Sequence, residues 1–101
     1  MANFIKNTRH FGIVVSDLEK SIKFYEEFGL KIIKQMDESG DHIDKMLSLQ
    51  NVNVTTVKMA ASENDTLIEL LHYKSPDSIQ VNRKINDFGP SHLAFTVNNL
   101  D

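Results

Sequence analysis

The sequence contains no cysteine, no long apolar run and no low-complexity segment. The absence of cysteine excludes disulfides, thiolate metal sites and a cysteine nucleophile, and it fits a reducing compartment. No apolar run approaches the ~18 residues of a membrane-spanning helix. The first ten residues, MANFIKNTRH, lack the apolar centre of a secretion signal. We therefore expect a cytoplasmic protein with no membrane partner.

Positive charge is also scarce. The 11 lysines and arginines stand against 14 aspartates and glutamates, which gives a net charge of −3, and no basic run interrupts the chain. A nucleic-acid partner is therefore not expected. Hydrophobic residues make up 41% and charged residues 25% of the 101 residues. These are ordinary values for a globular protein, and the length suits one domain or one half of a duplicated fold.

The pattern of apolar and turn residues predicts an α+β protein. Ser16 and Glu19 have the spacing of a capping box, which predicts that Ser16 caps a helix over residues 17–28, with Leu18, Ile22, Tyr25 and Phe28 on one face. Gly29 supplies a left-handed stop. The β-branched and apolar segments predict strands over residues 10–15, 30–36, 52–60, 66–73 and 91–97, with a short helix over 43–49.

Two stretches of the sequence are alike. RHFGIVVSDLE (residues 9–19) and SHLAFTVNNLD (residues 91–101) align at an offset of 82 residues, so that His10 matches His92 and Leu18 matches Leu100. We interpret this repeat as two modules of one fold, with a first βαβββ module over 9–73, a linker over 74–90 and the start of a second module over 91–101. On this interpretation residues 1–101 form a single, truncated domain.

The strand TLIELLHY is apolar on both faces, because Ile68 and Leu70 alternate with Leu67 and Leu71. The single long helix covers one face, so the other needs a second module or a partner chain. We therefore expect a homodimer or a longer chain.

Three side chains are candidate metal ligands. If Phe11 packs under the helix, His10 points to the open face, and Glu69 lies on the face opposite Ile68. The repeat puts His92 in the position of His10. Two imidazoles and a carboxylate suit a borderline divalent metal. Separately, His10 could be a core or surface histidine and Glu69 an exposed residue on an edge strand.

The segments HFGIVVSDLEKSIKFYEEFGLKI, TLIELLHY and GPSHLAFTVNNLD resemble the vicinal oxygen chelate superfamily. This group includes glyoxalase I, methylmalonyl-CoA epimerase, extradiol dioxygenases, and fosfomycin and bleomycin resistance proteins. The pattern is most similar to that of the glyoxalase I-like and epimerase-like members. The resemblance implies two βαβββ modules that form a cup with metal ligands on the first and last strands of each module. It assigns His10, Glu69 and His92 as ligands of a divalent metal (Ni, Zn, Co, Mn or Fe). The fourth ligand would fall near residue 151, beyond Asp101.

The resemblance implies a glyoxalase-like metal-dependent lyase or isomerase that transfers a proton next to a carbonyl of a small, metal-chelated substrate. In this interpretation Glu69 is both a ligand and the catalytic proton acceptor. Two alternatives stay open, an extradiol-type dioxygenase and a metal-free protein that binds a small ligand.

Overall fold

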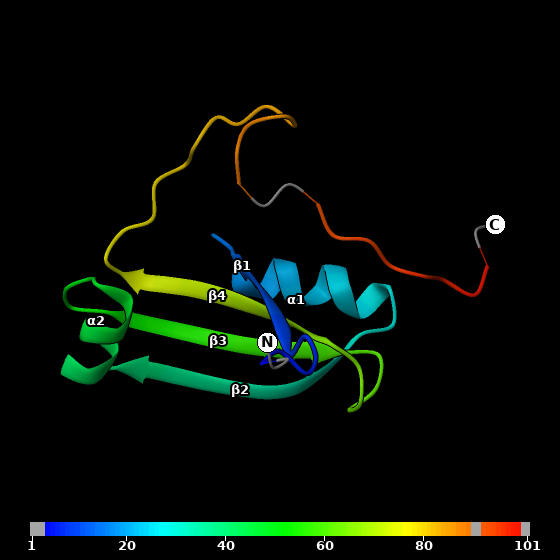
Figure 1. The fold of residues 1–101 in the computed structure, drawn as a ribbon. Coiled ribbons are helices and arrows are strands. Elements are labelled where there is room, and N and C mark those ends of the chain that lie inside the picture. The colour runs from blue at the N-terminus through cyan, green and yellow to red at the C-terminus, as the bar shows by residue number, and fades with distance from the viewer. Residues whose placement is uncertain (1–3, 90–91, 100–101) are drawn as a thin grey trace.

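The computed structural model describes residues 4–89 and 92–99 of the chain. One four-stranded sheet has the order β1-β4-β3-β2, with β1 parallel to β4 and the other neighbours antiparallel (Figure 1). The elements in chain order are β1 (His10–Val14), α1 (Leu18–Glu27), β2 (Lys31–Ser39), α2 (Asp41–Leu47), β3 (Asn53–Ala60) and β4 (Leu67–Ser75). The predicted α+β class and the βαβββ order are confirmed, with α2 inserted between β2 and β3.

Helix α1 begins one residue later than the capping box predicts. The N-cap is Asp17, whose carboxylate accepts a hydrogen bond of 3.1 Å from the Lys20 amide. The assignment of Ser16 as the cap is therefore wrong. The physical reason is that aspartate caps as well as serine does, and Asp17 has the extended backbone that an N-cap requires. At the other end, Gly29 has a φ of 98° and supplies the predicted left-handed stop.

The core lies between α1 and one face of the sheet. Its buried residues are Val57, Met59, Ile68 and Leu70, and Leu18, Ile22 and Tyr25 of α1 pack against them. Each buried aliphatic side chain stabilises the fold by roughly 1.5–3 kcal/mol. Phe28, predicted on the same helix face, is instead 70% exposed, because it lies past the last helical residue and its ring contacts Phe24.

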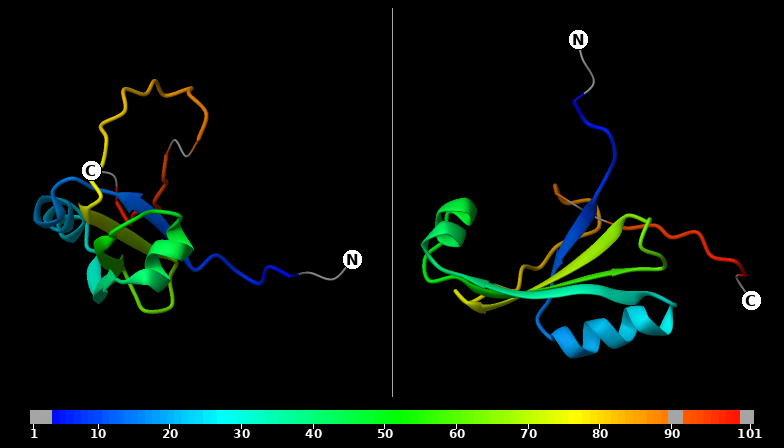
Figure 2. Two further views of the ribbon diagram at one scale, coloured as in Figure 1. Left: turned by 90° about the vertical axis from the view of Figure 1, so that its left-hand side faces the viewer. Right: turned by 90° about the horizontal axis from the view of Figure 1, so that it is seen from below.

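The opposite face of the sheet, here called the open face, has no long helix over it in the part of the chain that the structure describes. Figure 2 shows α1 on one side of the sheet and α2 on the other side, near one end. Val14 and Met36 of the open face are exposed, while Val54 and Thr56 on the same face are buried. None of the described helices is long and apolar enough to cross a membrane.

The predicted strand over 91–97 is not found among its described residues. Residues 92–97 form no strand, and Ser91 lies outside the described residues. A strand needs a neighbour to accept and donate its backbone hydrogen bonds, and β1 has that neighbour in β4. At the 82-residue offset, the counterpart of β4 would fall after residue 101. The preceding connector also starts later than predicted, because β4 continues to Ser75.

Candidate functional site

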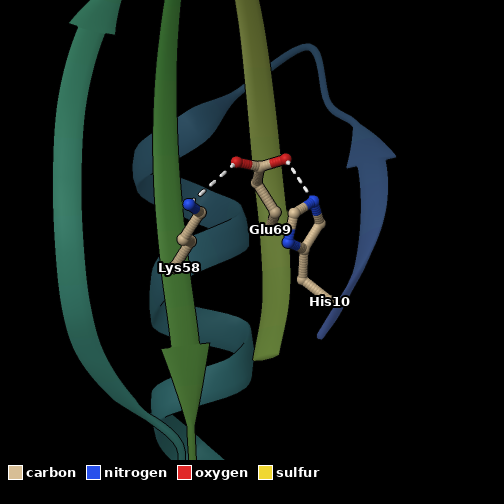
Figure 3. A network of polar contacts seen from close by, with 3 residues as sticks. All are labelled: His10, Lys58 and Glu69. Carbon is tan, nitrogen blue, oxygen red and sulfur yellow. Dashed lines mark ion pairs between the residues drawn. The ribbon is translucent and has the colours of Figure 1, made fainter. Parts of the chain in front are cut away.

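The open face brings His10 and Glu69 together. His10 is the first residue of β1, and Glu69 is the third residue of β4, the parallel neighbour of β1. The His10 Nε2 atom lies 3.5 Å from Glu69 Oε1 (Figure 3). This proximity follows from the alternation of side chains along two adjacent strands, which puts both on the face away from α1.

Lys58 is the third member of the cluster, and the sequence analysis missed it. Lys58 lies directly opposite Glu69 across the antiparallel β3–β4 pair, and its Nζ atom is 3.8 Å from Glu69 Oε2. Figure 3 shows Glu69 between the two basic side chains, with one carboxylate oxygen toward each. The sequence did contain a signal for Lys58, which is the one charged residue in the strand segment VTTVKMA. A charged side chain in a central strand needs a partner of opposite charge or a hydrogen-bond acceptor.

All three side chains are partly withdrawn from water. The exposed fraction of the side chain is 15% for Glu69, 21% for Lys58 and 37% for His10. A carboxylate with so little hydration is costly unless cations or hydrogen-bond donors surround it. The ammonium group of Lys58 supplies a cation 3.8 Å from the carboxylate, and the His10 imidazole lies on its other side, so Glu69 is not a lone buried acid.

Gly12 leaves the space in which this cluster sits. It is the β1 residue opposite Glu69, and it is on the same face. A Cβ atom at this position would lie 3.1 Å from the Leu71 side chain and 4.0 Å from Glu69 Oε1. A larger residue at this position would therefore press against Leu71 and occupy the volume next to the carboxylate.

The pair of His10 and Glu69 fits a divalent metal in donor type and spacing. Imidazole nitrogen and carboxylate oxygen are ligands of Zn²⁺ and similar ions. Two donors bound to one tetrahedral zinc ion at about 2.0–2.1 Å lie about 3.3–3.4 Å apart. The observed 3.5 Å is close to that spacing. Among residues 4–89 and 92–99, however, no group of three or more such donors converges.

His92, the predicted third ligand, does not join the pair. It lines a groove of about 670 Å³ beside β1, together with Phe24 and Tyr25 of α1 and with Arg83. The structure thus places two of the three predicted ligands side by side and the third elsewhere.

A second polar cluster lies on the face of the sheet that α1 covers. The Thr55 hydroxyl donates a hydrogen bond of 2.6 Å to Asp37, and Lys74 Nζ lies 3.7 Å from the same carboxylate oxygen. The hydrogen bond from Thr55 and the charge of Lys74 hold the pKa of Asp37 below its ordinary value of 3.8. Since Asp37 and Thr55 lie on the face opposite Glu69, this cluster takes no part in the candidate site.

Known proteins resemble this chain in sequence and in structure. The 2-epi-5-epi-valiolone epimerase of Actinomyces sp. is 26% identical over 95 residues, which cover 91% of this chain and 52% of the epimerase. The chain therefore spans about half the length of this curated relative. The crystal structure of a glyoxalase family protein from Bacillus cereus matches with a TM-score of 0.78 and 26% identity, over 87% of this chain and 60% of that one.

A family model covers nearly the whole sequence. The model of the Glyoxalase/Bleomycin resistance protein/Dioxygenase superfamily matches residues 8–101, which include both copies of the repeat. The order and pairing of the strands agree with this match, because the similar glyoxalase family structure overlays most of the chain. The chain therefore belongs to the Glyoxalase/Bleomycin resistance protein/Dioxygenase superfamily.

Proposed function

We propose that this chain is part of a metal-dependent isomerase or lyase that moves a proton next to a carbonyl of a small substrate. The observation that supports this proposal most strongly is the pair of His10 and Glu69, 3.5 Å apart on the open face of the sheet. In this proposal both residues are metal ligands, and His92 joins them when residues 91–101 take their place in a second module.

A divalent ion bound by these ligands would polarise adjacent substrate oxygens and stabilise the negative charge of an enediolate. The residues of this chain have separate tasks. Strand β1 fixes the position of His10 as a metal ligand. Gly12 leaves room for a substrate beside the Glu69 carboxylate. Glu69 would accept the proton from the carbon next to the carbonyl at one carboxylate oxygen and return it to the neighbouring carbon on the same side of the substrate.

The other half of the cup is part of the same proposal. The open face bears partly exposed apolar side chains, such as Val14 and Met36, that a second module would cover. The chain spans 52% of the epimerase relative and 60% of the similar structure, as one module and the start of another would. We propose that this second module comes from a longer protein or from the partner in a homodimer.

The relatives favour an isomerase over a dioxygenase, because the similar curated protein is named an epimerase. The metal-free alternative has one observation in its favour. Within the described residues His92 does not converge with His10 and Glu69, and a protein that only binds a ligand needs no such convergence.

Metal content separates these functions. The protein is purified without a histidine tag, and bound Ni, Zn, Co, Mn and Fe are measured. We expect one equivalent of metal together with isomerisation of a hemithioacetal or epimerisation next to a carbonyl. Iron with oxygen uptake on a catechol would indicate the dioxygenase, and failure to bind any added metal would indicate the metal-free protein.

A further inference from the structure

We propose that Lys58 and Lys34 form an anion-binding site beside His10 and Glu69, so that the substrate is an organic carboxylate or phosphate. This inference rests on the proposed function, because it names the substrate class of the same site. The observation behind this inference is that two lysines lie opposite each other on neighbouring strands. The proposed metal ligands, His10 and Glu69, give no reason for this pairing of like charges.

Lys34 and Lys58 lie directly opposite each other in the antiparallel pair of β2 and β3. Residues in this relation project from the same face, with Cβ atoms about 4.5–5.5 Å apart. Lys58 projects toward Glu69, so both lysines are on the open face. Like charges at directly opposite positions destabilise a sheet. A bound anion between the two ammonium groups would remove this repulsion.

The ammonium group of Lys58 has donors to spare. Its 3.8 Å distance from Glu69 Oε2 is an ion-pair distance, but it is too long for a hydrogen bond. An ammonium group has three N–H donors. The side chain is only 21% exposed, so its aliphatic part is packed and its charged end is held near the strand. These donors are therefore positioned for an acceptor that arrives from solution.

The charges on this part of the open face do not balance once the carboxylate has another partner. Glu69 of β4 is the acid next to Lys58. Glu38, the acid of β2 on this face, is four residues beyond Lys34, about 13 Å along the strand. Glu63 and Asp65, in the loop before β4, line the same groove as Lys58 and His10, but neither forms an ion pair with a lysine among the described residues. If Glu69 shares its charge with a divalent ion, neither Lys34 nor Lys58 keeps an ion-pair partner among the described residues. An anionic group of the substrate would supply it while its neighbouring oxygens reach the metal.

Inorganic phosphate is titrated into the metal-free wild-type chain and into metal-free Glu69→Gln, whose neutral amide mimics a carboxylate that shares its charge with a metal, and this tests the site without any catalytic readout. Backbone amide shifts in two-dimensional NMR report the position and affinity of binding. We expect shifts around Lys34 and Lys58, and about tenfold weaker binding in Lys58→Met, since one charge-assisted contact is lost. Lys58→Arg restores binding and so separates charge from packing. Lys23→Met, which removes a lysine of α1 on the other side of the sheet, leaves the affinity unchanged.

A parallel titration with acetate shows whether the site prefers a carboxylate or a phosphate group. Tighter binding of phosphate points to a phosphorylated substrate, and tighter binding of acetate points to a carboxylic acid. The inference is overturned if neither anion shifts these amides, or if Lys58→Met binds both as the wild type does. A zinc titration of the wild-type chain tests the proposed function separately. If the wild type binds phosphate but not zinc, the proposed function is contradicted and the anion site is not.

Discussion

Removal of the Glu69 charge tests the energetics of the open-face cluster. In Glu69→Gln the amide has nearly the same shape, but Lys58, 21% exposed, loses its counter-charge. At 3.8 Å, Coulomb's law gives an attraction of about 1 kcal/mol in water and about 4 kcal/mol at an effective dielectric constant of 20. Desolvation of both groups offsets part of this attraction. We therefore expect a coupling energy of about 1 kcal/mol between Lys58 and Glu69.

The coupling is measured with a double-mutant cycle of Lys58→Met, Glu69→Gln and the combined variant. Urea unfolding followed by circular dichroism gives the free energy of unfolding of each variant at one fixed pH. The pair of Lys74 and Asp37 serves as the matched control, because its side chains are 48% and 72% exposed and solvent screening should make its coupling smaller than that of Lys58 and Glu69. Free energies that add without coupling at Lys58 and Glu69 would refute the electrostatic reasoning.

Three further predictions concern single positions. Gly12→Val fills the space beside Glu69 and overpacks against Leu71, so zinc affinity measured by competition with a chelator should fall at least tenfold, while Gly12→Ala should have a smaller effect. Lys34→Thr removes the repulsion with its opposite lysine and should raise the free energy of unfolding by about 0.2–1 kcal/mol in urea; equal or lower stability would contradict this. Because the pKa of Asp37 is lowered in the folded state, its contribution to stability is complete above the ordinary value of 3.8 and is lost as the pH falls through the folded value. Thr55→Val removes the main cause of that shift, so acidification from neutral pH to below 3.8 should destabilise this variant less than the wild type; identical pH profiles would show that the hydrogen bond does not matter.

The sequence predicted the module well because its signals are local. Alternating apolar residues, Gly29 and β-branched residues each act over a few positions, and the helices and strands predicted between residues 10 and 73 were found close to their predicted places. The strand predicted over 91–97 was not found among its described residues. The helix start was misassigned by one residue because Ser16 and Asp17 are both good caps. The backbone conformation of Asp17 and its hydrogen bond from the Lys20 amide identify the cap, and neither can be read from the sequence.

The candidate site was predicted in part for a similar reason. Strand alternation alone put His10 and Glu69 on one face, and the structure shows them 3.5 Å apart. Lys58 was missed because its proximity depends on the register between β3 and β4, which no local pattern specifies. His92 was predicted from a repeat of the first strand. The position of such a strand depends on the strand that pairs with it, and residues 92–97 pair with no strand in the described part of the chain.

The shared binding of one cation by His10 and Glu69 is tested most directly by NMR of the imidazole nitrogens during a zinc titration. We predict that the Nε2 resonance of His10 shifts on addition of one equivalent of zinc, and that Glu69→Ala weakens this response at least tenfold while the protein stays folded. Zinc binding that leaves the His10 nitrogens unchanged, or that is as tight in Glu69→Ala as in the wild type, would contradict the assignment.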